Sequence, residues 1–256
     1  MEDTDWLNQP IQIATSVGGV RATGTPWDGV VRGDVAPWPP PELVQKAYAS
    51  RQVRAFRDGE LSRATASLGY YCDLQSIHSE DAVTWSLFGP LAYATDAVRS
   101  QYAAQLIGHC LDESVPATSA HVWLWRRIPH PDTLVPGGPE IDFGIHTCST
   151  LVLGEAKWRS GVGKAQGAGG QKDQLQLRVE FCEKYGRQLY PGVDKFVVLF
   201  VSQMRGSLSD AQLSLGSERV RVVDATWAEL GALSANPWRM EFADQLAWRQ
   251  ARSHAR

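Results

Sequence analysis

Asp142, Glu155 and Lys157 combine residue types and spacing that suit metal-assisted hydrolysis. Asp142 lies in the segment 140–146, where apolar and polar residues alternate as they do in a half-buried strand. Glu155 and Lys157 stand two positions apart near the end of the segment 149–158, which we predict to be the next strand. Because side chains two positions apart point to the same face of a strand, the carboxylate and the ammonium share a face.

The intervening residues 143–154 are enough for a hairpin connection, so strand pairing can bring Asp142 beside Glu155. Two neighbouring carboxylates repel each other unless a cation lies between them, so we expect the loss of either to relieve this repulsion. Oxygen ligands suit Mg²⁺ or Mn²⁺ better than Zn²⁺, and magnesium held by one or two carboxylates keeps several waters. A bound metal lowers the pKa of such a water, and Lys157 can orient it or stabilise charge on a phosphate. The pattern predicts phosphodiester hydrolysis.

The segment Pro139-Glu140-Ile141-Asp142 followed by Glu155-Ala156-Lys157 resembles the motif of the PD-(D/E)xK nuclease superfamily, which includes many restriction endonucleases and recombination nucleases. The resemblance covers about residues 80–202. It implies an α/β fold with a restriction endonuclease-like core, in which a central mixed β-sheet is flanked by helices in the order α-β-β-β-α-β. It also implies that Asp142 and Glu155 bind the metal and that Lys157 serves the attacking water. In this chain the proline lies three residues before Asp142 instead of next to it.

The same resemblance implies two further catalytic residues. One is an acidic metal ligand on the helix before the sheet, for which the sequence offers Glu80 or Asp81. We favour Glu80, because its longer side chain reaches farther from the helix. The other is a glutamine on the helix after the second motif strand, for which Gln174 is the candidate, with Arg178 one turn later.

Several residues after the motif are candidate substrate contacts. The cationic side chains can neutralise phosphates, and an aromatic ring next to them can stack on a base. These candidates are Trp158, Arg159, Lys164, Lys172 and Arg178. The glycine-rich segment 161–170 lacks the Walker pattern, so we interpret it as a loop beside the site and not as a nucleotide-binding loop.

Each of these features also has an ordinary structural explanation. A Glu-x-Lys pair on a strand is usually an exposed ion pair that contributes little to stability. Glu80 and Asp81 suit the first turn of a helix because of the helix dipole. A helix expected at 42–57 carries a stripe of arginines (Arg51, Arg54 and Arg57) that either contacts nucleic acid or faces water. The His146-Thr147-Cys148 segment has no partner at a spacing typical of a metal site.

Composition places the chain among globular proteins. It has 256 residues, of which 43% are hydrophobic and 21% charged, and its apolar segments are all far shorter than the roughly 20 residues of a membrane span. The N-terminus is acidic and resembles no secretory signal, so we expect a cytoplasmic protein. The four cysteines form no C-x-x-C pair, and we expect them to be reduced thiols.

The net charge of the chain affects how strongly it can bind nucleic acid. With 25 basic and 28 acidic residues the chain has no overall positive field, although DNA affinity depends largely on neutralising phosphates. We therefore expect weak DNA binding by the isolated chain. Residues 1–41, rich in proline, glycine and tryptophan, are expected to form an arm that docks a protein partner or a second copy of the chain, and no membrane is expected as a partner.

The remaining segments complete the expected organisation. The arm precedes a nuclease-like domain at 42–256, whose core lies at about 80–202. Helices are predicted at 79–88, 91–111, 171–185, 227–233 and 237–252, and further strands at 121–126, 195–201 and 219–223. The sequence predicts a Mg²⁺- or Mn²⁺-dependent nuclease acting on DNA, for example in restriction or antiphage defence. The alternative is a non-catalytic binding or scaffold subunit that keeps the fold.

Overall fold

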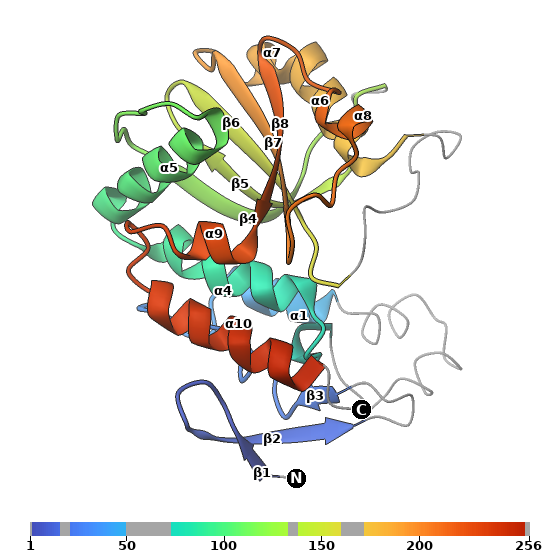
Figure 1. Cartoon of the computed structure of the whole chain (residues 1–256). Coiled ribbons are helices and arrows are strands. Elements are labelled where there is room, and N and C mark those ends of the chain that lie inside the picture. Colours follow the sequence, from blue (N-terminus) through green and yellow to red (C-terminus); the bar gives the residue numbers. More distant parts are fainter. Residues whose placement is uncertain (1, 16–20, 50–72, 133–137, 160–171, 254–256) are drawn as a thin grey trace. The chain divides into compact units, whose positions relative to one another are not determined.

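The computed structural model describes residues 2–15, 21–49, 73–132, 138–159 and 172–253 (Figure 1). These residues belong to two compact units, each described here by itself. The first comprises Met1–Tyr93 and Met240–Arg256, and the second comprises Ala94–Arg239. Within the described ranges, none of the helices has the length and apolar character needed to cross a membrane.

A five-stranded mixed sheet forms the centre of the second unit. Its strands, in spatial order, are β4 (His121–Arg127), β5 (Glu140–His146), β6 (Thr150–Ala156), β7 (Lys195–Ser202) and β8 (Val220–Thr226). The first three strands pair antiparallel, whereas β6, β7 and β8 pair parallel. The predicted α/β class and the mixed sheet flanked by helices are confirmed, and β8 forms one edge of the sheet.

The strands follow from the residue patterns. Every residue of β6 and all but the first of β7 are buried, as is typical of apolar strands covered on both faces. Two glycines allow aromatic rings to lie directly on neighbouring strands. A Cβ atom at Gly144 would lie 2.1 Å from the ring of Trp123, and one at Gly154 would lie 2.2 Å from the ring of Phe143. Close packing of the hairpin that carries Asp142 thus requires glycine at both positions.

Helices cover both faces of this sheet. On one face, Leu175 and Val179 of α6 (Gln174–Phe181) pack in the same buried cluster as Leu151 and Leu153 of β6. On the other face, Arg221 of β8 donates to the carbonyl oxygen of Leu111, at the end of α5 (Asp96–Leu111), at 2.7 Å. Tyr102 of α5 donates to the carbonyl oxygen of Leu230 in α9 (Trp227–Gly231). The row of Leu151 and Leu153 continues to Glu155, which therefore faces α6.

Some helix boundaries differ from the prediction. Helix α4 (Glu80–Tyr93) begins where expected, with the Ser79 hydroxyl accepting from the N–H of Ala82, but it continues through Pro90. The predicted break at Gly89-Pro90 is wrong, because residues 82–91 are all buried and packing keeps them helical. The break lies at Thr95, whose side chain caps α5. Helix α6 begins at Gln174 with Asp173 as its cap, and continues through a π-helical turn, Cys182–Gly186, into α7 (Arg187–Leu189).

The first unit contains a small antiparallel sheet of β1 (Glu2–Thr4), β2 (Pro10–Thr15) and β3 (Arg21–Thr23). Its helices are α1 (Pro41–Tyr48), the 3₁₀ turn η1 (Asp73–Gln75), α4 and α10 (Arg239–Ser253). Arg249 of α10 is fully buried and donates to the carbonyl oxygens of Gly29, Ser76 and Ile77, which joins three segments. The arginines at 51, 54 and 57 lie outside the described residues.

The segment before Pro41 packs within this unit. The Trp6 ring meets Trp248 edge-on, with ring centroids 5.5 Å apart, and Trp38 lies 6.2 Å from Trp85. The rings of Trp6 and Trp38 are both partly buried by these contacts within the unit. The contacts lend no support to the prediction that these rings dock a partner or a second copy.

Candidate metal-binding and active site

The β5–β6 hairpin brings the two predicted carboxylates together. The strands are in register from His146 opposite Leu151 to Phe143 opposite Gly154, so Asp142 and Glu155 are the next residues along the two strands. At this point the N–H of Ala156 donates to Oδ2 of Asp142 at 2.8 Å. The Asp142 side chain therefore reaches across to the residue that follows Glu155.

Two cationic side chains bind Glu155. The Lys157 ammonium lies 2.7 Å from Oε1 of Glu155, and the Arg178 guanidinium forms an ion pair with Oε2. Glu155 is 1% exposed and Arg178 0% exposed, so this is an interior charge cluster and not the exposed ion pair that such a pattern usually makes. With Asp142 included, two carboxylates face two cations.

The backbone of Lys157 is fixed on both sides. Its N–H donates to the carbonyl oxygen of Val201 in β7 at 2.8 Å, and its own carbonyl oxygen accepts from the indole N–H of Trp227 at 2.8 Å. Trp227 is itself buried at the start of α9. The ammonium of Lys157 is consequently attached to a backbone that strand and helix both hold.

The pKa of the Asp142 carboxyl is raised from its usual value to about 8. Burial is the largest cause, and repulsion from the Glu155 carboxylate adds to it. The positive charges of Arg178 and Lys157 and the N–H of Ala156 act in the opposite direction without cancelling the rise. The positive charges near Asp142 are therefore not sufficient to keep both this carboxyl and that of Glu155 ionised below about pH 8.

The donor set fits a hard divalent cation. The hydrogen bond from Ala156 goes to Oδ2 of Asp142, and the carboxylates of Asp142 and Glu155 are close enough to repel each other. Oxygen donors of two carboxylates, completed by water, suit Mg²⁺ or Mn²⁺. Within the described part of the chain, no group of three or more His, Cys, Asp or Glu side chains is arranged to hold a metal, so Asp142 and Glu155 stand as a pair.

The third predicted acid belongs to the other unit. Glu80 and Asp81 begin α4, and Asp81 forms an ion pair with Lys46 of α1 at 3.1 Å. The two acids thus point in different directions around the helix, as the roughly 100° step between neighbours requires. A role of Glu80 as metal ligand stays a prediction.

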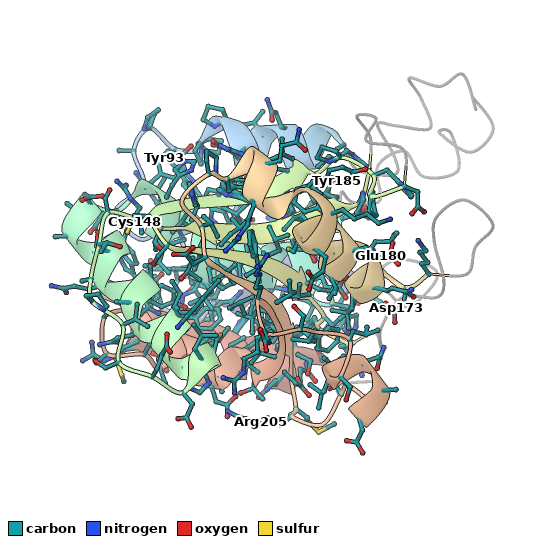
Figure 2. All side chains as sticks on the ribbon, turned by 90° about the horizontal axis from the view of Figure 1, so that it is seen from above. Tyr93, Cys148, Asp173, Glu180, Tyr185 and Arg205 are labelled. Atoms are coloured by element: carbon teal, nitrogen blue, oxygen red, sulfur yellow. The ribbon has the colours of Figure 1, made fainter. Side chains whose placement is uncertain are left out.

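The predicted site residues on α6 and just before it differ in their burial and in their contacts. Gln174 is half-buried, and only its carbonyl oxygen takes part in a hydrogen bond among the described residues, accepting from Arg178. Arg178 was predicted to contact substrate, but it is buried and contacts Glu155 instead. Lys172 is held by Asp132 at 3.0 Å and by Glu180 at 2.6 Å, with Glu180 on the outer side of α6 (Figure 2).

The other predicted substrate contacts differ in their exposure to solvent. Trp158 is 2% exposed, so its ring is not available to stack on a base, because the end of β6 runs through the interior instead of along a surface. Arg159, the next residue, is exposed. Lys164 lies outside the described residues. The cysteines Cys110, Cys148 and Cys182 are free thiols, as predicted.

The structure also places a second histidine, His121, beside His146, which sequence reasoning left without a partner. His146 lies directly opposite His121 in the β4–β5 register, and its ring meets Tyr190 edge-on. Both histidines line a pocket of about 370 Å³ together with Arg99 and Cys148. Antiparallel pairing of the two predicted strands 121–126 and 140–146 would have revealed this neighbourhood.

Comparison with known proteins gives no match: no family model, curated protein or solved structure is similar to this chain. The α/β class with a mixed sheet is observed directly. Functional interpretation therefore depends on the hairpin geometry and on the charges gathered at its end.

The raised pKa of Asp142 makes stability depend on pH. The folded state holds the proton more tightly than the unfolded state does, so stability declines as pH rises from about 4 to about 8 and stays low above that. Asp142→Asn removes this penalty and keeps an acceptor for Ala156. We expect it to stabilise the metal-free protein by about 1–2 kcal/mol at pH 9, because solvent screens a half-buried carboxyl, and by nothing near pH 4.

Urea denaturation in chelator at both pH values measures this effect. Asp194→Asn is the matched control, because the Asp194 side chain is 75% exposed in the same unit. A stabilisation of equal size at pH 4 and pH 9 would contradict the assigned cause.

Proposed function

We propose that this protein is a Mg²⁺- or Mn²⁺-dependent nuclease of the restriction endonuclease-like fold that hydrolyses phosphodiester bonds in DNA. One observation carries the proposal: the N–H of Ala156, next to Glu155, donates to Asp142 at 2.8 Å, and the Lys157 ammonium lies 2.7 Å from the Glu155 carboxylate. This set combines two metal-binding carboxylates and a cation beside the place where a phosphate would react.

The strand order supports the same proposal. Helix α4 precedes β4, β5 and β6 in the chain, and α6 then leads to β7, which pairs parallel to β6. Around the hairpin this is the α-β-β-β-α-β order that the resemblance implies. The carboxylates stand on the two central strands of that order.

Each side chain of the cluster has a distinct part in the reaction. Asp142 and Glu155 would hold the ion, which supplies, when bound, a water of lowered pKa and positive charge for the phosphate. Lys157, held through its backbone by β7 and α9, keeps its ammonium beside Glu155, where it can donate hydrogen bonds to the attacking water and to a phosphate oxygen. Its fixed position limits the reorganisation needed during the reaction.

A non-catalytic scaffold is favoured by one specific observation. Both oxygens of Glu155 already face cations, so this carboxylate is balanced in charge without a metal. Against this, burying the three charged groups of Glu155, Lys157 and Arg178 is costly, and a protein that only binds a partner has no need of them. A measurement of metal binding distinguishes the nuclease from the non-catalytic scaffold.

The experiment incubates purified chain with labelled single-stranded and duplex DNA in Mg²⁺, in Mn²⁺ and in excess chelator. We expect cleavage with either metal and none in chelator, because the nucleophilic water depends on the ion. Asp142→Ala should lose cleavage while its circular dichroism spectrum is unchanged, and Asp194→Ala should cleave like the original chain. Cleavage that persists in chelator or in Asp142→Ala excludes the metal site, whereas a chain that neither binds metal nor cleaves supports the scaffold.

A further inference from the structure

We propose that Arg178 is a positioning residue that holds Glu155 for metal binding and supplies a fixed positive charge, so that the site takes a single divalent ion. This inference rests on the proposed function. It assigns Arg178 a role at the metal site in place of the substrate contact expected from sequence.

Arg178 connects three elements at the site. Its guanidinium forms the ion pair with Glu155 of β6, donates to the carbonyl oxygen of Glu140 in β5 at 2.8 Å, and donates to that of Gln174 in α6 at 2.9 Å. The side chain is 0% exposed. Because the guanidinium is planar and rigid, contacts in three directions fix the carboxylate of Glu155 against both strands.

Charge counting limits the number of ions. The cluster holds the negative charges of Asp142 and Glu155 and the positive charges of Lys157 and Arg178. One divalent ion brings its net charge to about +2, which a phosphate group can offset only in part. A second ion would meet this excess in a largely buried site. Arg178 thus supplies charge that a second metal would otherwise provide.

Removal of the Arg178 charge should change metal binding and turnover in opposite directions. In Arg178→Met the ion meets one positive charge fewer, so we expect Mn²⁺ to bind about tenfold more tightly, the change that about 1.4 kcal/mol produces. The Glu155 carboxylate loses its anchor, so turnover should drop about a hundredfold, as it does when a reacting group is misplaced by about 1 Å. Purely structural damage would weaken both.

Two other variants distinguish the effect of the Arg178 charge from the effect of its planar shape. Arg178→Lys keeps the charge but loses the planar fork, so Mn²⁺ affinity should stay close to that of the original chain while turnover recovers in part. Arg187→Met is the matched control, because Arg187 lies on α7 and its side chain is 57% exposed. It should change neither quantity.

The measurement is calorimetric titration of the full chain with Mn²⁺ in the absence of nucleic acid, together with turnover on duplex DNA. One ion per chain, tighter binding by Arg178→Met and slower turnover support the inference. Two ions per chain, or weaker binding by Arg178→Met, overturn it while leaving the nuclease intact. If Arg178→Met does not fold, the number of Mn²⁺ ions bound by the original chain and the Mn²⁺ affinity of Arg178→Lys still test the inference. A chain that binds no Mn²⁺ overturns the inference and the proposed function together.

Discussion

Glu155→Ala is expected to destabilise the metal-free protein by about 3–5 kcal/mol, the usual cost of removing one partner from a buried ion pair. Glu155 is the only acidic partner of Arg178 among the described residues, and it also binds Lys157. Its loss leaves a guanidinium that is 0% exposed without its ion-pair partner. From the sequence we expected that losing either carboxylate would relieve repulsion. In the structure this expectation applies to Asp142 alone, because Glu155 is needed to balance the charge of Arg178.

Thermal and urea denaturation in chelator at pH 7 measure the difference. Asp142→Ala on the facing strand is the control, because among the described residues Asp142 forms no ion pair with a cation and accepts a backbone hydrogen bond from Ala156. We expect this control to change the free energy of unfolding by less than about 1 kcal/mol. Equal destabilisation by the two substitutions would show that Arg178 does not depend on Glu155 for its charge balance.

The hairpin and its face could be predicted because both depend on short-range patterns. Alternation in 140–146 set the strand and its two faces, and the strand now observed has the bounds Glu140–His146. The spacing of Asp142 and Glu155 fitted an antiparallel connection, and the observed register ends at the residues next to them, Phe143 and Gly154. Side-chain parity alone then placed Lys157 on the face of Glu155, where its ammonium is found.

Features that depend on packing between distant segments could not be predicted in this way. The resemblance pointed to Gln174, and Arg178 was predicted to contact substrate, because helical periodicity cannot tell which side chain of α6 meets Glu155. Trp158 stands between two charged residues in the chain, which suggested exposure, yet it is buried at the end of a strand covered on both faces. Pro90 is a local helix breaker, but the burial of residues 82–91 outweighs that preference.

Lys157→Met is expected to lower turnover by about 10²–10⁴-fold, the range typical of a group that assists proton transfer or charge stabilisation in the transition state. Methionine keeps the apolar stem of the side chain, which is 10% exposed, and leaves unchanged the backbone contacts to Val201 and Trp227. Glu155 retains its ion pair with Arg178, so stability should decline much less than in Glu155→Ala. Single-turnover cleavage in saturating Mg²⁺, beside a Mn²⁺ titration without DNA, should show slow chemistry with metal binding retained. Turnover within about threefold of the original chain would mean that the ammonium serves only to balance the charge of Glu155.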